Sequence, residues 1–329
     1  MLTDKINRIS LGHLPTPLDA LPRLAEKLGG PQLFVKRDDQ TGLATGGNKT
    51  RKLEFLVADA LERKADTLIT AGAPQSNHAR QTAAAAARAG MRCVLVLRGQ
   101  PPSEHQGNLL LDELLGAQIR WAERNAVPAT MEAVAAELRT QGRAPYIIPY
   151  GGSNPVGATG YVAAMEELME QARQMNLRFD RIVFASSSGG TQAGLVVGAK
   201  ATGYSGQVLG ISVDQKREDL QSLVAALATE TAAHLELDLE FSPGDIAVNA
   251  DYLGAGYGIL SEPEREAIRL AAETEGLLLD PVYTGRAFAG MIDLIRKGEI
   301  RRDESVLFWH TGGTPALFAY AEELVKHLD

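Results

Sequence analysis

Short apolar runs alternate with helix-like segments along most of the chain, and this alternation limits the possible folds more than any other feature. The runs "DTLITAG" (66–72) and "CVLVLRG" (93–99) have the length of buried strands, and an alanine-rich, helix-like segment separates them. Two further runs, "AQIRWA" (117–122) and "PYIIPYGG" (145–152), each follow another helix-like segment. Because neighbouring parallel strands need a long crossover, the pattern predicts a four-strand α/β unit over residues 51–155.

The second half of the chain repeats this alternation less regularly. A strand ending at Ala185 leads into a polar glycine loop and a helix from about Thr191. Further strands are expected at "QVLGISV" (207–213) and "ESVLFWHTGG" (304–313), and a last helix at "PALFAYAEELVKHL" (315–328). The pattern therefore indicates a second α/β unit.

The order of these units predicts an insertion. A clear strand, "LFVKRDD" (33–39), precedes the four-strand unit. We therefore expect two doubly wound, mostly parallel-sheet domains, in which a small domain of residues 51–155 is inserted into a large domain of residues 1–50 and 156–329. Ligands of such folds bind at the carboxyl ends of the strands and in clefts between domains.

Composition excludes several classes of partner and site. The net charge is −8 over 329 residues and no long basic stretch is present, which argues against nucleic acid or an anionic membrane as a partner.

The first ten residues lack an apolar core and no apolar run reaches about 18 residues, so we expect a cytoplasmic protein. Cys93 is the only cysteine, in an apolar run, and is expected to be a buried, inert thiol. No pair of histidines or carboxylates has metal-ligand spacing, so no metal is expected.

The loop "SSSGGTQAGL" (186–195) is the strongest chemical signal. It lies between a strand and a helix, where backbone N–H groups and the helix dipole favour an anion. Its four hydroxyls and two glycines exceed what a tight turn needs. It does not fit the G-x-G-x-x-G dinucleotide pattern, so we expect it to bind a single phosphate.

The stretch "TGGNKTRKLEF" (45–55) raises a choice between a nucleotide-binding loop and a reactive lysine. Gly42 and Gly46 have nearly the spacing of P-loop glycines, but Gly47 and Asn48 separate Gly46 from Lys49. A P-loop lysine directly follows its glycine, because the loop must wrap a phosphate. We therefore reject the P-loop interpretation.

Three other segments carry polar residues whose roles the local pattern leaves open. The turn "QSNH" (75–78) offers four polar side chains where one helix cap would suffice. "DPVYTG" (280–285) is expected to end a strand, with Tyr283 and Thr284 beside the turn. His310 is expected to be a buried core histidine.

Together these segments resemble the fold type II pyridoxal-phosphate (PLP) enzymes, in particular the branch of D-cysteine desulfhydrase, L-cysteate sulfo-lyase and 1-aminocyclopropane-1-carboxylate (ACC) deaminase. The motifs that carry the resemblance run in the family's order over almost the whole chain. They are "LPTPL" (14–18), "VKRDD" (35–39), "GGNKTRKLEFL" (46–56), "QSNHARQTAA" (75–84), "GGSNPVGATGYV" (151–162), "SSSGGTQAG" (186–194), "GYGI" (256–259), "LLDPVYTG" (278–285) and "HTGG" (310–313).

The resemblance implies a cofactor, PLP, in the cleft between the domains, and a set of site residues. Lys49 is the implied Schiff-base lysine and proton acceptor. The implied catalytic residues are Lys49, Ser76, Tyr257 and Tyr283. The implied cofactor-binding residues are Lys49, Asn77, which faces the ring hydroxyl, Ser188, Gly189, Gly190 and Thr191 around the phosphate, and Thr284 and Thr311 near the pyridine nitrogen. The implied substrate-binding residues are Gln75, Ser76, Asn77 and His78. Lys52 is interpreted equally well as a solvent-exposed charge on the helix and as a residue that acts beside Lys49.

The implied reaction is an α,β-elimination that yields pyruvate, ammonia and the leaving group. This chain has Thr284 where the deaminase pattern has an acid, and His78 where that pattern has glutamine. A threonine favours a neutral pyridine ring, which suffices for a good leaving group such as thiolate. We therefore favour a D-cysteine desulfhydrase over a sulfo-lyase, for which only Arg80 among the motif residues could hold a sulfonate. ACC deaminase and a catalytically silent PLP- or phosphate-binding protein remain as alternatives, and the family implies a homodimer.

Overall fold

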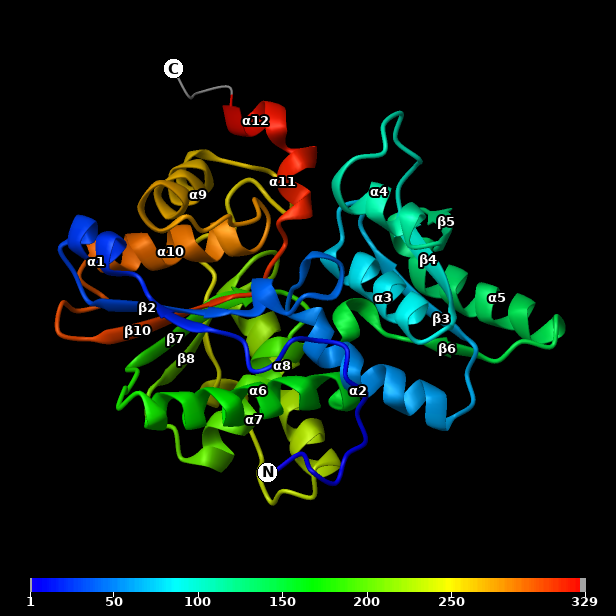
Figure 1. Ribbon diagram of the computed structural model, residues 1–329, viewed down its shortest axis with the longest axis horizontal. Helices are drawn as coiled ribbons and strands as arrows, with labels where there is room; N and C mark the ends of the chain where they lie inside the picture. The colour runs from blue at the N-terminus through cyan, green and yellow to red at the C-terminus, as the bar shows by residue number, and fades with distance from the viewer. Residues whose placement is uncertain (1, 326–329) are drawn as a thin grey trace.

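The computed structural model describes residues 2–325, and they form two open sheets side by side (Figure 1). The larger, six-stranded sheet contains, in spatial order, β1 (Leu18–Ala20), β2 (Gln32–Arg37), β10 (Ser305–His310), β7 (Arg181–Ser186), β8 (Gln207–Ser212) and β9 (Ala247–Asn249). Only β1 runs antiparallel to its neighbour. The smaller sheet is wholly parallel and contains β5 (Gln118–Ala122), β4 (Arg92–Arg98), β3 (Thr67–Gly72) and β6 (Pro145–Ile147).

Helices cover both faces of the larger sheet. One face carries α1 (Pro22–Leu28), α9 (Glu262–Glu275) and α10 (Thr284–Arg296), and the other carries α6 (Pro155–Gln174), α7 (Gly190–Thr202) and α8 (Arg217–His234), as Figure 1 shows. Strand β10 explains why: Val306 and Phe308 pack with the first group, whereas Leu307 and Trp309 pack with the second. Successive strand residues point to opposite faces, so a strand that is apolar throughout needs helices on both sides.

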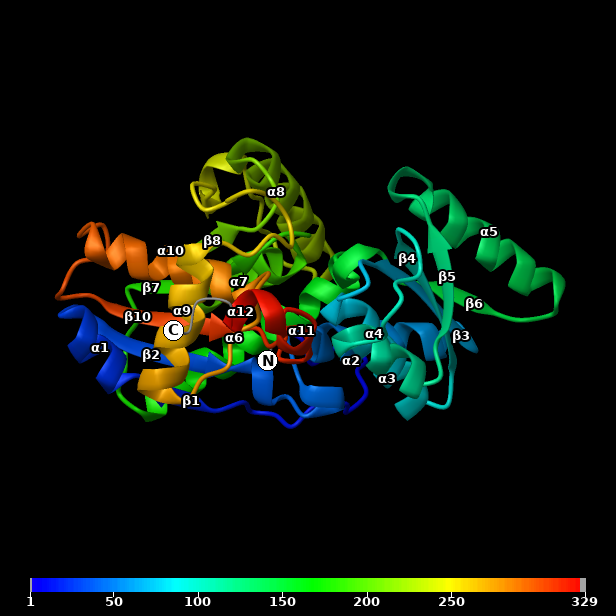
Figure 2. The same cartoon turned by 90° about the horizontal axis from the view of Figure 1, so that it is seen from above.

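The smaller sheet follows the same rule. Helices α2 (Lys49–Glu62), α3 (Asn77–Arg88) and α4 (Gly107–Leu114) contribute to the core on one face, and α5 (Val127–Thr140) covers the other, as the view in Figure 2 shows. In β4, Cys93, Leu95 and Leu97 face the first group, and Val94 and Val96 face α5. Short 3-10 helices are η1 (Asp38–Gln40), η2 (Leu43–Thr45), η3 (Arg124–Ala126), η4 (Tyr150–Gly152) and η5 (Pro243–Asp245).

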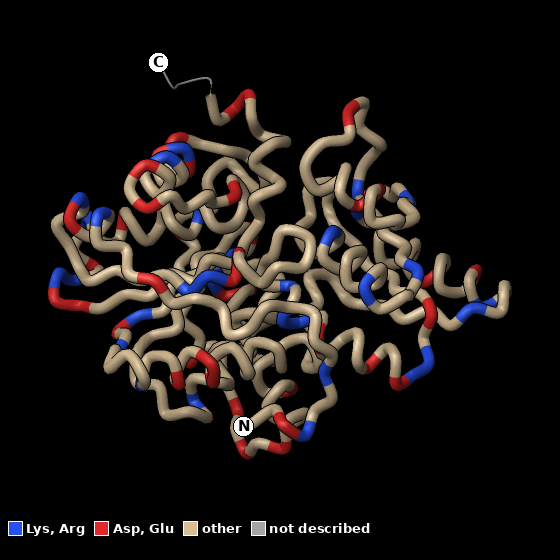
Figure 3. The backbone as a smooth tube through the Cα atoms, viewed as in Figure 1, with Lys and Arg blue, Asp and Glu red and all other residues tan. Residues whose placement is uncertain are grey.

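The predicted fold class is confirmed. Strands β1 and β2 precede the small sheet in the chain, β7 to β10 follow it, and all six belong to one sheet. The small α/β unit is therefore inserted into the larger one. The boundaries at residues 50/51 and 155/156 stay a prediction. Acidic and basic residues are interspersed along the backbone, with no extended basic segment (Figure 3).

Two sequence-based predictions of elements were wrong. No strand directly precedes "DPVYTG": residues 276–280 have no regular secondary structure, and α10 begins at Thr284. A short apolar run does not by itself distinguish a strand from a buried irregular segment. The single C-terminal helix expected over 315–328 is divided at Tyr320 into α11 (Pro315–Ala319) and α12 (Ala321–Val325), and its last three positions lie outside the described residues.

Two further findings concern the described helices and the cysteine. None of the helices within residues 2–325 has the length and apolarity needed to cross a membrane. Cys93 is buried in β4, and burial raises the pKa of its thiol, which agrees with an inert core cysteine.

Candidate active site

The lysine at the start of α2 follows a turn that only glycine can form. Gly46 has φ 72° and ψ −177°, and a Cβ at this position would lie 2.0 Å from the carbonyl oxygen of Asp39. Gly47 has φ 129°, and its amide donates to the carbonyl of Asp38. The amide of Asn48 donates to the carbonyl of Thr311 at 2.9 Å, which ties this turn to the loop after β10. The turn therefore places Lys49 at the carboxyl ends of the larger sheet's strands.

Two amines share this buried position. Burial lowers the pKa of Lys49 to about 8, although a hydrogen bond with Lys52 partly opposes the change. Lys52 is 1% exposed, and burial together with the charge of Lys49 holds its pKa well below the ordinary value. The alternative that Lys52 is a charge in solvent is therefore wrong. A lowered pKa makes Lys49 available as a neutral nucleophile near physiological pH.

A cavity that is partly open to solvent lies in front of Lys49 between the two sheets. The residues that line it are Asn48, Lys49, Asn77, His78, Tyr150, Gly151, Ala185, Ser186, Ser187, Ser188, Gly189, Thr191, Tyr283 and Thr311. The fold thus brings together predicted site residues from five distant segments. Gln75, Ser76, Gly190, Tyr257 and Thr284 do not line the cavity.

The loop before α7 forms one end of this cavity. Gly189 caps α7 with φ 80°, a conformation that favours glycine. The hydroxyl of Ser188 lies 2.8 Å from that of Ser153, which also accepts from the amide of Gly190 at 3.2 Å. A Cβ on Gly190 would lie 2.8 Å from the Lys52 Nζ. A lysine, hydroxyls and a helix N-terminus thus converge, and together they form a site for an anion.

Two observations show that the site fits a phosphate-bearing ring. The hydroxyl of Ser186 is buried in the cavity wall and has no hydrogen-bond partner among the described residues. The amine of Lys52 bonds the Gly151 carbonyl at 3.1 Å and the Ser153 hydroxyl at 3.3 Å, and it has no carboxylate partner among the described residues. A phosphate here would supply the negative charge that two buried amines lack. Ser186 is one of the four hydroxyls that the sequence placed in this loop, whereas sequence reasoning assigned no role to Ser153. Lys52 was left open, and its position three residues after Lys49 puts both amines on one helix face.

The polar turn before α3 divides into structural and cavity-facing residues. The Ser76 hydroxyl accepts from the amide of Ala79 at 3.1 Å as the cap of α3, and its own proton stays available. The side chain of Gln75 points to α4, where its amide group bonds the backbone of Gln106 and Asn108. The geometry therefore gives Gln75 a role in joining α3 to α4.

His78 is buried in the cavity wall. Its Nε2 lies 2.8 Å from the hydroxyl of Thr70, and that hydroxyl donates to the carbonyl of Ile148 at 2.9 Å. Burial, followed by the charges of Lys49 and Lys52, keeps the pKa of His78 well below its ordinary value. The imidazole is therefore neutral at physiological pH.

Tyr283 and Tyr150 line the cavity, and Tyr257 contacts Tyr283. The hydroxyls of Tyr257 and Tyr283 lie 2.5 Å apart, and their rings meet edge to face. Burial, followed by the neighbouring Tyr257, raises the pKa of Tyr283 well above the ordinary value, so its proton is retained at neutral pH. Tyr150, which sequence reasoning did not identify, is 42% exposed and stands at the mouth of the cavity. The guanidinium of Arg98 lies 4.5 Å from the centre of the Tyr257 ring.

The two predicted partners of a pyridine nitrogen have different surroundings. The hydroxyl of Thr284 donates to the carboxylate of Asp280 at 2.8 Å and accepts from the Asp280 amide at 2.7 Å. Thr311 lines the cavity, and its hydroxyl has no hydrogen-bond partner among residues 2–325. His310 is buried, and its Nε2 lies 3.2 Å from the carbonyl of Leu278, as expected for a core histidine. The geometry thus favours Thr311 over Thr284.

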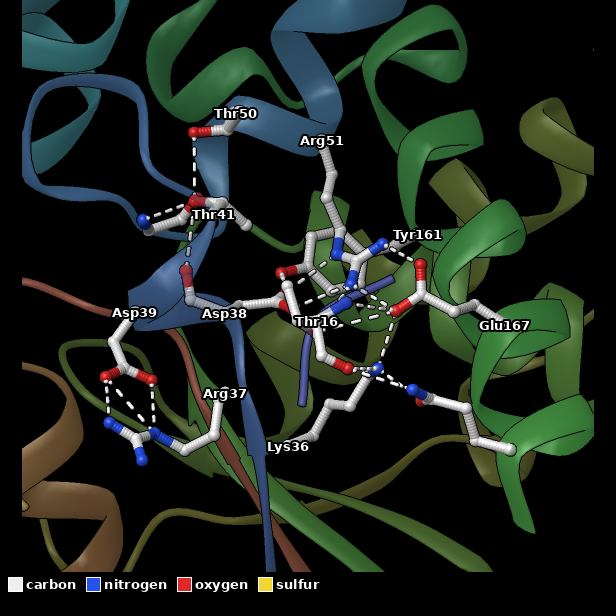
Figure 4. Close-up of polar contacts among 12 residues, drawn as sticks. Thr16, Lys36, Arg37, Asp38, Asp39, Thr41, Thr50, Arg51, Tyr161 and Glu167 are labelled. Carbon is white, nitrogen blue, oxygen red and sulfur yellow. Dashed lines mark hydrogen bonds and ion pairs between the residues drawn. The ribbon is translucent and has the colours of Figure 1, made fainter. Parts of the chain in front are cut away.

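A buried network of charges lies behind Lys49 and connects three elements (Figure 4). Arg51 of α2 bonds both Asp38, at 2.9 Å from Nε and Nη2, and Glu167 of α6, at 3.0 and 2.9 Å. Lys36 of β2 bonds Glu167 at 2.5 Å, and the hydroxyl of Tyr161 donates to Asp38 at 2.6 Å. The network therefore fixes α2 two residues after Lys49.

No group of three or more His, Cys, Asp or Glu within the described part of the chain is placed to hold a metal ion. A neutralised lysine at a helix start, a phosphate loop and a hydroxyl- and amide-lined cavity between two open α/β sheets define a PLP-dependent enzyme. Comparisons with known proteins agree. A family model described as "Pyridoxal-phosphate dependent enzyme" matches residues 9–312. The chain therefore belongs to this family, and the predicted cofactor is confirmed.

Two relatives and two solved structures refine the comparison. The chain is 45% identical to a D-cysteine desulfhydrase of Klebsiella pneumoniae, over 96% of this chain and 97% of the relative. It is 44% identical to a Pyrococcus abyssi protein provisionally named as a 1-aminocyclopropane-1-carboxylate deaminase, over 99% and 98%. A crystal structure of an ACC deaminase homologue superposes with a TM-score of 0.91 at 40% identity, covering 99% of this chain and 97% of that one. Maize serine racemase shares the fold, with a TM-score of 0.65 at 20% identity over 95% and 92%.

Proposed function

We propose that the protein is a PLP-dependent lyase that eliminates the sulfur substituent of D-cysteine and releases pyruvate, ammonia and sulfide. The relative at 45% identity over nearly the whole chain supports this reaction. One observation carries the choice of substrate: within the described residues, neither a carboxylate nor an arginine lines the cavity in front of Lys49. The roles given below to individual residues are part of the same proposal.

The phosphate end of the cofactor is assigned to the loop before α7. Backbone groups of Gly189 and Gly190, with the hydroxyls of Ser188 and Thr191, surround the place that the Lys52 amine approaches, and a bound phosphate would favour the charged form of that amine. The Asn48 side chain donates to the Thr191 hydroxyl at 3.1 Å and holds it in place. The side-chain amide of Asn77 faces the ring hydroxyl, and Thr311 faces the ring nitrogen.

The cofactor, when bound, supplies an electron sink for a carbanion next to the amino group. Lys49 would hold the cofactor, and its free amine would remove the proton from the α-carbon of the substrate. This role needs an amine that is neutral at the working pH, and burial provides it by lowering the pKa of Lys49 to about 8. The hydroxyl of Tyr283, paired with Tyr257, retains its proton and can donate it toward the departing sulfur. His78 orients the substrate from the side of α3, whose start is capped by Ser76.

The cavity wall favours thiolate as the leaving group over the opening of a cyclopropane. A carboxylate beside the ring nitrogen would keep that nitrogen protonated and strengthen the electron sink. The wall offers the Thr311 hydroxyl instead, and a neutral ring suffices when the leaving group is good. An ACC deaminase reaction is therefore the less favoured assignment.

A cysteate sulfo-lyase is the second candidate, and Arg98 is the observation in its favour. Arg80, the arginine that sequence reasoning left open, is 0% exposed and bonded to other residues, so it does not face the cavity. Arg98 stacks on Tyr257 near the exposed side of the site, where it could attract a sulfonate. The same charge would also attract the carboxylate of any amino acid, so it does not outweigh the first proposal.

A panel assay tests the proposal. The protein is incubated with D-cysteine, L-cysteine, L-cysteate, β-chloroalanine and ACC, and 2-oxo acids are measured with sulfide or sulfite. D-cysteine is expected to give the highest kcat/KM, with pyruvate and sulfide in equal amounts. Lys49→Ala is expected to lose both turnover and the borohydride-sensitive visible band. Higher kcat/KM for cysteate with sulfite release, or for ACC with a four-carbon oxo acid, would overturn the substrate assignment, and no release from any substrate would indicate a silent binding protein.

The assembly state is a separate proposal. We expect a homodimer, as the family resemblance implies, and sedimentation velocity at micromolar concentration measures it. A species with the mass of one chain would contradict the expectation.

A further inference from the structure

Arg80 connects three segments of the active site without touching the cavity itself. It lies one turn into α3 and is 0% exposed. Its Nη1 donates to the Oδ1 atoms of Asn77, at 2.9 Å, and of Asn108, at 2.5 Å. Its Nη2 donates to the carbonyl of Gly46 at 2.8 Å, in the turn before Lys49. One guanidinium therefore holds the start of α3, the start of α4 and the lysine turn.

The chemistry of this contact fixes the orientation of Asn77. A guanidinium has donors only, so an amide that meets it must present its oxygen. The Nδ2 of Asn108 also donates to the Asn77 Oδ1, at 3.0 Å. The two donors thus occupy the oxygen of Asn77 and turn its Nδ2 away from Arg80. That Nδ2 has no acceptor among residues 2–325, and Asn77 lines the cavity.

A flipped amide would be a poor site for the cofactor. An asparagine side chain without neighbours has two orientations of similar shape, and only one of them presents a donor. The flipped form would direct an acceptor oxygen at the cofactor's ring hydroxyl oxygen and bring its own N–H groups against Arg80. The bonds from Arg80 therefore make one orientation strongly preferred.

We propose that Arg80 is a positioning residue, which holds the Asn77 amide so that its Nδ2 donates to the ring hydroxyl oxygen of the bound cofactor. This inference rests on the proposed placement of the cofactor ring beside Asn77. Arg80 also bonds the Gly46 carbonyl, so it sets the position of Asn77 relative to the turn that carries Lys49.

A double-mutant cycle on cofactor affinity tests the proposal. Cofactor-free Asn77→Ala, Arg80→Met and the double variant are titrated with PLP, and the visible absorbance gives Kd. Each single variant is expected to raise Kd about tenfold, the effect of losing one hydrogen bond to a charged group. The double variant is expected to raise Kd about tenfold as well, because Arg80 acts through Asn77. A wild-type Kd for Arg80→Met, or a roughly hundredfold increase in the double variant, would overturn the proposal.

Two further variants separate positioning from charge and from stability. Arg80→Lys keeps the charge but not the planar fork, so it should bind PLP as weakly as Arg80→Met, and it serves as the main variant if Arg80→Met does not fold. Full recovery of affinity in Arg80→Lys would show that charge alone acts and would contradict positioning. Leu95→Ala truncates the core of the same domain without removing a hydrogen bond of Arg80, and should lower the melting temperature while keeping Kd within about twofold. A loss of affinity in Leu95→Ala equal to that in Arg80→Met would mean that stability explains both.

A spectroscopic measurement completes the test. Visible circular dichroism of the bound cofactor reports how the pocket holds the ring, and it should be reduced alike in Asn77→Ala and Arg80→Met at saturating PLP. An unchanged spectrum in Arg80→Met, beside a changed one in Asn77→Ala, would also refute the role. None of these measurements needs turnover, so the proposed reaction can fail while this inference stands, and the reverse is equally possible.

Discussion

Replacement of Glu167 by glutamine is expected to destabilise the protein strongly, although the change is isosteric. Glu167 accepts hydrogen bonds from Lys36, from both Nη atoms of Arg51 and from the amide of Thr16. The network of Figure 4 balances two buried cations with two carboxylates, Glu167 and Asp38. The substitution leaves one buried positive charge without compensation.

The magnitude follows from the burial of the partners. The side chains of Lys36 and Arg51 are 0% and 2% exposed, and removal of one partner from a buried ion pair costs about 3–5 kcal/mol. Glutamine keeps one acceptor oxygen, so we expect the lower end, about 3 kcal/mol, or roughly a hundredfold in the unfolding equilibrium. Urea denaturation followed by far-ultraviolet circular dichroism measures it, with an unchanged m-value expected.

Glu170 on the same helix provides the control. Its ion pair with Arg173 has side chains that are 51% and 73% exposed, so Glu170→Gln should not move the urea midpoint measurably. Equal, small effects of the two substitutions would refute the argument, because they would show that the buried network contributes no more than a surface pair.

The pH dependence gives an independent check. Burial alone would raise the pKa of Glu167, but hydrogen bonds and charge from Arg51 and Lys36 outweigh it and lower the pKa. A carboxyl whose pKa is lowered in the folded state stabilises the protein above its ordinary pKa, and this contribution is lost as the pH falls through the folded value. The difference between wild type and Glu167→Gln should therefore be constant above about pH 5 and shrink below about pH 4. A difference that grew on acidification would contradict the assignment.

Three further predictions concern the site and its surroundings. A methyl group at Gly190 would lie 2.6 Å from the Ser153 hydroxyl and 2.8 Å from the Lys52 amine. Gly190→Ala should therefore weaken PLP binding at least about tenfold in equilibrium titrations while the fold persists. Wild-type affinity in this variant would refute the phosphate site. Burial raises the pKa of Asp112 to about 8, so the folded state binds more protons than the unfolded state between about pH 4 and 8 and stability falls with rising pH. Asp112→Asn lacks this titrating carboxyl, so its free energy of unfolding in urea should increase relative to that of wild type from pH 5 to 8. A decrease would count against the raised pKa. Borohydride trapping of PLP on Lys49 in the cofactor-free protein should reach half its maximal rate near pH 8, and a half-point near 10.5 would show that the amine is not perturbed.

Local sequence patterns were sufficient for the fold class and for the main chemical features. Apolar runs and helix-like segments recur at short range, so their alternation identified both sheets and the insertion. The phosphate loop and the lysine turn are also contiguous, and glycine reports their backbone directly: Gly46 and Gly189 both have positive φ. Helix α8 and the separation of α11 from α12 were missed because weakly periodic and short segments give little signal.

Contacts between distant segments could not be predicted in the same way. Lys52 and Ser153 are about a hundred positions apart, yet they meet beside the phosphate loop, and no spacing along the chain reports this. The sequence also does not distinguish Asn77 from Gln75 in the same turn. Their different roles depend on α4, because Asn108 bonds both side chains and only Asn77 remains directed at the cavity.

A neutral cofactor ring is still expected, but Thr311 supports it in place of Thr284. Sequence reasoning based it on Thr284, but the hydroxyl of Thr284 is engaged by Asp280 through both its proton and its oxygen. Asp280 itself is buried and accepts from the amides of Val282, Tyr283 and Thr284 as well as from that hydroxyl, so its carboxylate holds the turn before α10. An acid committed to four donors has little capacity left to bind a ring proton. In the proposed placement, the described cavity wall then presents the Thr311 hydroxyl to the ring nitrogen. So weak an electron sink would suit a substrate whose leaving group departs easily, as we propose for the sulfur of cysteine.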